Sequence, residues 1–186
     1  MNEIKSIGLI GISGVGKSTF IRKVQSLCTI EHLSASAIIQ NELLETTGKL
    51  YTPEEMRKRD TDANQTALIS GFRKSKRQSS TPIVLDAHTI IDKGGLIVPI
   101  KPSVFKSFEF DLLVCLTAPA ARINEQRNND SSRMRPKLTV KELEEHQDKS
   151  TQQAIQIGIA LGVPAITLSS GDELKLVELI YPKFKA

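Results

Sequence analysis

The sequence is poor in cysteine and in aromatic residues, and it has no long hydrophobic run. Its two cysteines, Cys28 and Cys115, have no partner at a metal-ligand or redox spacing, so we expect both to be reduced, buried and inert. Aromatic residues make up only 4% of the chain, which leaves few stacking platforms for nucleic-acid bases. No apolar run approaches the ~20 residues of a membrane span, and Met1 to Lys5 do not read as a secretory signal. These absences favour a cytoplasmic protein with no membrane partner.

The rest of the composition is that of an ordinary folded domain. Hydrophobic residues make up 39% of the 186 residues and charged residues 25%, so the chain can bury a full core without disulfides. Lysine and arginine number 25 against 21 acidic residues, which gives a net charge of +4 and a pI of about 9.1. Length and composition together predict one globular domain.

Short runs of Ile, Val and Leu alternate along the chain with longer stretches of helical spacing. This alternation predicts an α/β protein whose parallel sheet is covered by helices on both faces. The five predicted strands are Ile4 to Ile10, Cys28 to Leu33, Ile83 to Leu85, Leu112 to Leu116 and Ala165 to Leu168.

Two helix starts carry a capping box, in which Thr at the N-cap precedes Glu at the third helical position. One pairs Thr52 with Glu55 and the other pairs Thr139 with Glu142. The second of these helices is predicted to run from Val140 to Leu161 and to end at the glycine that follows.

The first predicted strand leads into Gly11-Ile12-Ser13-Gly14-Val15-Gly16-Lys17-Ser18-Thr19, which fits the P-loop pattern G-x-x-x-x-G-K-[ST]. The glycines allow backbone N–H groups to surround a phosphate, and the helix that follows adds the positive end of its dipole. Lys17 would reach the β and γ phosphates, and Ser18 would bind Mg²⁺. A glycine-rich turn that binds nothing is the alternative interpretation.

A second metal-facing carboxylate is predicted at Asp86. It ends the apolar run from Pro82 to Leu85, and so lies at the carboxyl end of a strand, where open α/β sheets bind ligands. A turn or capping role is the alternative. Ala87 follows, where ATP-driven motors commonly have a glutamate that activates water. This difference, with the lack of an N-K-x-D guanine-reading segment, favours phosphoryl transfer over a motor or a GTPase switch.

A cluster of cations lies in the polar stretch that follows the fourth predicted strand. It contains Arg127, Arg133, Arg135 and Lys137. Phosphoryl transfer needs positioned cations around the moving group, and guanidinium can contact two phosphate oxygens at once. We therefore predict a lid that closes over a nucleotide. The alternative is a solvated basic loop.

The helical stretch 34–78 is longer than a simple crossover requires, and we expect it to bind the phosphoryl acceptor. Ser34 and Ser36 follow the second predicted strand and would hold an acceptor phosphate, unless they only cap a helix. Arg57 would pair with the same phosphate, unless it forms a surface salt bridge.

The basic run from Arg73 to Arg77 has two interpretations, a nucleic-acid contact or the end of a long helix. Cations at a helix carboxyl end complement the helix dipole and need no partner. With so few aromatic residues in the chain, this second interpretation is favoured, and nucleic acid is disfavoured as a partner.

Taken together, these residues resemble the archaeal-type adenylate kinases, within the P-loop nucleoside monophosphate kinases. The resemblance rests on the P-loop, Glu55-Met56-Arg57-Lys58, Asp86-Ala87-His88, Gly95-Leu96 with Pro99, and the series Arg127, Asp130, Arg133 and Arg135. It implies a three-layer P-loop kinase fold with a five-stranded parallel sheet, a helical acceptor-binding insertion and a short Arg-rich lid. Within a single domain 1–186, we assign the core to 1–33, 82–126 and 137–186, the insertion to 34–78 and the lid to 127–137.

The resemblance also implies roles for residues. It makes Mg-ATP the donor and a nucleoside monophosphate the acceptor. The implied catalytic residues are Lys17, Arg127, Arg133 and Arg135; the implied acceptor-facing residues are Ser34, Ser36, Arg57, Asp86 and His88; and Ser18 and Asp86 would hold Mg²⁺. Some members are homotrimers, so a homo-oligomer is compatible with the resemblance. The sequence departs from the family at Ser34-Ala35-Ser36, where a glycine-containing segment is expected, and at Ala87, where Ser is usual; both leave the acceptor's identity open.

The sequence thus predicts a cytoplasmic kinase that transfers the γ-phosphoryl group of Mg-ATP to AMP or a related (deoxy)nucleoside monophosphate. One alternative is a nucleotide-dependent binding protein or weak ATPase that acts on a macromolecular partner. Another is a kinase of a nucleoside or other small-molecule hydroxyl, for which Asp86 would accept the proton.

Overall fold

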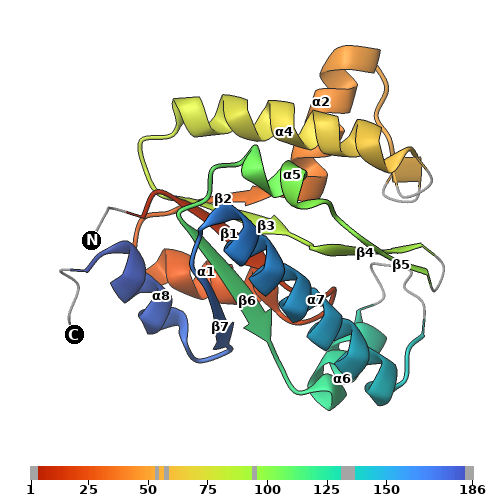
Figure 1. Ribbon diagram of the computed structural model, residues 1–186, viewed down its shortest axis with the longest axis vertical. Coiled ribbons are helices and arrows are strands. Elements are labelled where there is room, and N and C mark those ends of the chain that lie inside the picture. Colours follow the sequence, from red (N-terminus) through yellow and green to blue (C-terminus); the bar gives the residue numbers. More distant parts are fainter. Residues whose placement is uncertain (1–3, 53–54, 57–58, 94–95, 131–136, 183–186) are drawn as a thin grey trace.

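The protein is built around a parallel sheet of five strands in the order β2-β3-β1-β6-β7 (Figure 1). The structure is a computed structural model that describes residues 4–52, 55–56, 59–93, 96–130 and 137–182. All four strand pairings in the sheet are parallel. The strands are β1 (Ser6–Ile10), β2 (Glu31–Ser34), β3 (Ile83–Ala87), β6 (Leu112–Thr117) and β7 (Ala165–Ser169).

Helices cover both faces of the sheet, so the fold has three layers (Figure 1). The helices are α1 (Lys17–Leu27), α2 (Ala35–Thr47), α4 (Thr61–Gln78), α5 (Pro102–Lys106), α6 (Ala120–Asn129), α7 (Val140–Leu161) and α8 (Glu173–Ile180). One core cluster joins the sheet to α1, α6 and α8, and the other joins it to α2, α4, α5 and most of α7. The predicted fold class is confirmed.

The five predicted strands correspond to the five strands of the sheet in their positions along the chain, but the second begins later than expected. Cys28 does not start a strand: it caps the carboxyl end of α1, where its N–H donates to the Val24 carbonyl. It is half-buried rather than buried, whereas Cys115 is fully buried in β6. Burial raises the pKa of both thiols, and that of Cys115 to about 11.

Both predicted capping boxes form. The Thr139 hydroxyl accepts from the Glu142 N–H, and the Glu142 carboxylate accepts from the Thr139 N–H. Thr52 and Glu55 make the same two bonds, at 3.2 Å to the Thr52 hydroxyl and at 2.8 Å to the Glu55 carboxylate. The helix α7 ends at Gly162 as predicted, because this residue adopts a left-handed conformation with φ 66°.

A two-stranded antiparallel hairpin was not predicted. Its strands are β4 (Ile90–Lys93) and β5 (Leu96–Pro99), and it follows β3 directly. Its residues lack the strict alternation of a half-buried strand, so the pattern alone did not indicate it.

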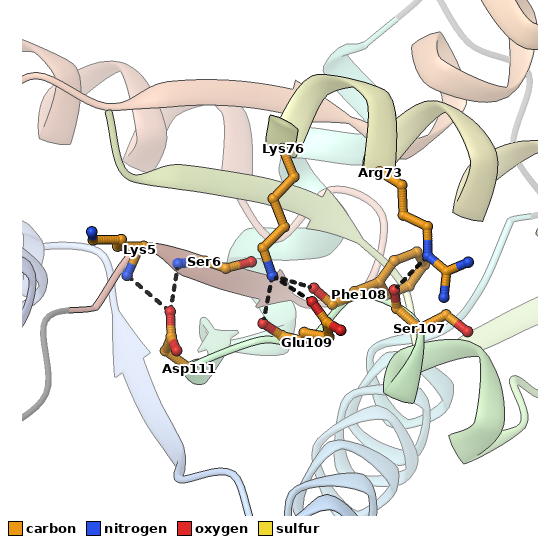
Figure 2. A network of polar contacts seen from close by, with 8 residues as sticks. All are labelled: Lys5, Ser6, Arg73, Lys76, Ser107, Phe108, Glu109 and Asp111. Atoms are coloured by element: carbon orange, nitrogen blue, oxygen red, sulfur yellow. Dashed lines mark hydrogen bonds and ion pairs between the residues drawn. The ribbon is translucent and has the colours of Figure 1, made fainter. Parts of the chain in front are cut away.

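The basic run at the end of α4 is bound to the rest of the protein at the amino edge of the sheet (Figure 2). Lys76 Nζ donates to the carbonyl oxygens of Phe108 and Glu109 at 3.0 and 2.9 Å, and Arg73 Nε donates to a neighbouring carbonyl. Lys74 lies 2.6 Å from the buried carboxylate of Glu42 on α2. These contacts support a structural role for the run.

Asp111 completes this amino-edge network. Its Oδ2 accepts from the backbone N–H groups of Lys5 and Ser6, each at 2.9 Å, and so holds the start of the central strand (Figure 2).

Among the described residues, no helix has both the length and the hydrophobicity that crossing a membrane requires.

We predict that Gly71→Ala destabilises the protein by about 1–3 kcal/mol, because helices α2 and α4 cross too closely for another carbon atom. A Cβ at Gly71 would overlap the side chains of Ile38 and Glu42. This overlap outweighs the ~1 kcal/mol that alanine gains over glycine in helix propensity. Urea unfolding measures the difference.

The control for this variant is Ser70→Ala, at the exposed neighbouring position of the same helix. It should change the free energy of unfolding by less than about 0.5 kcal/mol. Equal stabilities of the two variants would contradict a close crossing of the helices.

Candidate functional site: a P-loop at the carboxyl edge of the sheet

The P-loop connects the central strand β1 to α1. Gly14 and Gly16 have φ values of 90° and 101°, which side chains rarely adopt, and these two turns bring the loop around to the helix. Gly16 is the N-cap of α1, and Lys17 is its first residue. The N–H groups of the first helical turn therefore face the hollow of the loop, together with the positive end of the helix dipole. This arrangement is suited to holding a phosphate.

The Lys17 ammonium lies buried beneath the loop. Its Nζ is 2.5 Å from the Gly11 carbonyl oxygen and 3.3 Å from that of Ile12. It also lies 3.6 Å from Asp86 Oδ1, with the two side chains only 7% and 17% exposed. In so dry an environment the attraction between the two charges is much stronger than at the surface. The P-loop lysine and the β3 carboxylate, predicted separately, thus meet.

The sheet register explains this meeting. Asp86 lies on β3 opposite Leu9 of β1, so its carboxylate stands beside the strand that leads into the P-loop. On its other side Asp86 is opposite Ser34, the last residue of β2. Adjacent strands lie about 4.8 Å apart, so the three strand ends form one continuous edge.

Ser34 and Ser36 are also brought together. Their hydroxyl oxygens are 3.0 Å apart. Ser34 occupies the N-cap position of α2, but its side chain makes no capping hydrogen bond. Capping therefore does not explain the serine pair, which stands at the mouth of the predicted acceptor region, one strand away from Asp86.

His88 contacts the P-loop backbone directly. Its Nδ1 is 2.8 Å from the Gly11 carbonyl oxygen, which can only accept, so Nδ1 carries a proton and donates. The same oxygen accepts from Lys17. His88 thus helps to hold the start of the loop, a contact that the sequence alone did not indicate.

The Arg127 side chain lies against the P-loop at Gly14. A Cβ added to Gly14 would meet the Arg127 side chain at 2.6 Å and that of Ile123 at 3.5 Å. Both residues belong to α6, whose N-cap is Pro119. The absence of a side chain at Gly14 is what allows this helix to approach the loop.

Three predicted site residues lie outside the described part of the chain. They are Arg57, Arg133 and Arg135. Their positions, and the lid 127–137 beyond Asp130, stay predictions.

The donor atoms at the site fit Mg²⁺. This cation prefers oxygen ligands and usually keeps several waters while binding one or two protein oxygens and the substrate phosphates. The exposed Ser18 hydroxyl in the first turn of α1 and the Asp86 carboxylate supply such oxygens. In the ranges that the structure describes, no three His, Cys, Asp or Glu side chains gather into a metal site of their own.

Sequence reasoning missed Gln147 and Ser150 of α7, which contact segments next to the site. They take core-facing positions in the helical series Leu143, Gln147, Ser150, Ala154 and Ile157. A polar residue at a core-facing position was the available signal, but its partners could not be inferred from it.

A family model described as AAA domain (AAA_17) matches residues 10–144, which is more than half of the chain. The chain belongs to this family. It is thus a member of the P-loop kinases, and its P-loop is a nucleotide-binding loop.

Curated proteins of similar length also resemble this chain over most of its length. The chain is 24% identical over 166 residues to an adenylate kinase of Methanococcus aeolicus, covering 86% of each chain. It is 26% identical over 151 residues to an adenylate kinase of Pyrococcus abyssi, covering 79% of this chain and 76% of the relative. The predicted resemblance to archaeal adenylate kinases is confirmed, at low identity.

Solved structures show the same fold. A shikimate kinase from Acinetobacter baumannii in complex with shikimate superposes with a TM-score of 0.57 at 18% identity, over 98% of this chain and 96% of that one. TT1252 from Thermus thermophilus gives a TM-score of 0.55 at 12% identity over the whole of both chains. At these identities the likeness establishes the three-layer fold alone.

Gly14→Ala should weaken the affinity for Mg-ATP and Mg-ADP by at least about tenfold, or 1.4 kcal/mol. The added Cβ would both strain a backbone with φ 90° and push Arg127 away from the loop. Isothermal titration calorimetry measures the affinity.

Gly48→Ala is the matched control. Gly48 also has a positive φ, 68°, but a Cβ there would meet nothing within 4 Å. The control should therefore lose about 1–2 kcal/mol of stability and keep its affinity for nucleotide. Unchanged affinity in Gly14→Ala would show that this part of the loop does not touch the phosphates.

Proposed function

We propose that the protein is a nucleoside monophosphate kinase that transfers the γ-phosphoryl group of ATP to AMP or a closely related nucleotide. The observation that carries the proposal is the buried contact between Lys17 and Asp86, with Ser34 on the next strand. A phosphate-binding cation, a metal-binding carboxylate and an entrance for an acceptor thereby share one edge of the sheet. The adenylate kinases among its relatives support a nucleotide as the acceptor.

In this proposal the P-loop amides and Lys17 bind the β and γ phosphates of ATP, and Ser18 and Asp86 hold Mg²⁺. Bound Mg²⁺ would supply charge neutralisation between the β and γ phosphates. Lys17 has to leave the Gly11 carbonyl in order to reach a phosphate, and its long side chain allows this movement. Arg127, above Gly14, stands where it can approach the transferred group.

The transfer itself needs little proton chemistry from the protein. An oxygen of the acceptor phosphate attacks the γ-phosphorus, the bond to the β-phosphate oxygen breaks, and ADP leaves. The attacking oxygen is already anionic near neutral pH, so no general base is required. Positioned cations and exclusion of water therefore account for catalysis.

The acceptor is assigned to the insertion 34–78. The hydroxyls of Ser34 and Ser36 would contact its phosphate, with Arg57 supplying the charge and His88 nearby at the end of β3. We assign 1–33, 82–126 and 137–186 to the core, and 127–137 to the lid.

The first test mixes the purified protein with Mg-ATP and, one at a time, each ribo- and deoxyribonucleoside monophosphate, and separates the products by chromatography. We expect one acceptor to be converted to its diphosphate while ADP forms in equal amount. Lys17→Ala should lower this rate by at least about a hundredfold, because the buried cation at the phosphates is lost. ADP release at the same rate with and without every acceptor would overturn the proposal in favour of an ATPase.

A second prediction separates transfer from hydrolysis. Arg57→Ala should lower the rate of transfer to the mononucleotide by about tenfold or more, while slow hydrolysis of ATP in the absence of acceptor stays unchanged, because Arg57 is assigned to the acceptor alone. Lys58→Ala, at the next position in sequence, is the control. Full transfer by Arg57→Ala with every mononucleotide would refute the acceptor assignment.

A further inference from the structure

The helix α7 carries polar residues at two positions that face the core. Between the buried Leu143 and the buried Ala154 lie Gln147, which is half-buried, and Ser150, which is only 3% exposed. Polar groups in such places destabilise a protein unless they are hydrogen-bonded, and their bonds fix their partners in one geometry. The partners of these two residues therefore show which neighbouring segments α7 holds in place.

Gln147 makes two hydrogen bonds to a single residue. Its Oε1 accepts from the Ala118 N–H, and its Nε2 donates to the Ala118 carbonyl oxygen, both at 3.0 Å. Ala118 follows the end of β6 and precedes Pro119, the N-cap of α6. A side-chain amide that pairs with both backbone groups of one residue fixes the position and the orientation of that turn.

What this turn supports is the helix that carries Arg127. The helix α6 begins two residues after Ala118, and Arg127 lies in its last turn, over Gly14. A helix is stiff, so a small tilt at its start displaces its far end. The amide of Gln147 therefore sets where the Arg127 side chain meets the P-loop.

Ser150 holds a second segment, which does not lead to α6. The Thr89 hydroxyl donates to the Ser150 carbonyl oxygen at 2.9 Å and lies 3.1 Å from the Ser150 hydroxyl oxygen. Thr89 is fully buried and follows His88 at the end of β3. This neighbouring contact offers an internal comparison of similar burial and chemistry.

We propose that Gln147 is a positioning residue for phosphoryl transfer: by holding Ala118 it keeps α6 in place, and with it Arg127 over the phosphate-binding loop. The kinetic part of this inference rests on the proposed function. Both of the hydrogen bonds described for Gln147 go to Ala118, the residue before the N-cap of α6, so its influence on the reaction is argued through α6 and Arg127.

The kinetic test is a double-mutant cycle between Gln147→Leu and Arg127→Ala, run with whichever nucleotide the wild type phosphorylates. Gln147→Leu should lower kcat roughly ten- to a hundredfold, because a displaced catalytic group costs rate steeply, with less than about a threefold change in the KM for ATP. In the Arg127→Ala background the same substitution should cost less than about twofold. Equal costs in both backgrounds would overturn the proposal.

Two controls separate positioning from general destabilisation. Thr89→Val removes the neighbouring contact, and its effects should multiply with those of Arg127→Ala as independent changes do. Gln152→Leu, at an exposed position of the same helix, should leave kcat within about twofold of the wild type. Gln147→Glu retains an oxygen for the Ala118 N–H, so it should lie between wild type and Gln147→Leu, and it takes the place of that variant should Gln147→Leu not fold.

Amide hydrogen exchange tests the same proposal without any turnover. Gln147→Leu should speed exchange at Ala118 and along α6 by about tenfold or more while β6 keeps its protection, because only the local opening of the helix becomes easier. Thr89→Val should leave exchange along α6 as in the wild type. Unchanged exchange along α6 in Gln147→Leu would overturn the positioning role even if the kinase reaction is established; failure to phosphorylate any nucleotide would overturn only the proposed function.

Discussion

The arrangement of the candidate site depends on one buried cation, the ammonium group of Lys17. The Lys17 ammonium is held between the carbonyl oxygens at the start of the P-loop and the carboxylate of Asp86 on the neighbouring strand. Removing either charge would leave the other buried without its counter-charge, which is far more costly than losing an exposed ion pair. The contact requires β1 and β3 to be neighbours in register, and this sheet order in turn places Ser34 beside Asp86 and His88 against the start of the loop.

Much of the fold could be predicted because its signals are local. Strands β1, β3, β6 and β7 are largely apolar runs, the helix α7 begins with a capping box and ends at a left-handed glycine, and the P-loop is a contiguous motif. Each of these depends on residues within a few positions of one another, so the sequence shows them directly. The meeting of Lys17 with Asp86 could be anticipated as well, because Lys17 follows one strand and Asp86 lies near the carboxyl end of another in the same parallel sheet.

The features that could not be predicted depend on partners far apart in sequence. Gln147 bonds to Ala118 and Thr89 to Ser150, and no local pattern links these pairs. The start of β2 was predicted too early, at Cys28, because Cys28 and Ile30 suit a strand by type, whereas Cys28 caps α1 and the strand begins at Glu31. In the candidate site, the approach of Arg127 to Gly14 depends on the path of α6, which the motif does not specify.

The position of the central strand has a consequence for how the chain acquires its structure. The strand that leads into the P-loop comes first in sequence, yet it lies between β3 and β6, whose residues begin at positions 83 and 112. Pairings across so many residues form slowly, because closing the long intervening chain costs entropy before the new contacts stabilise it. During synthesis, the nucleotide-binding loop therefore cannot gain its rigid base until well over half of the chain has left the ribosome.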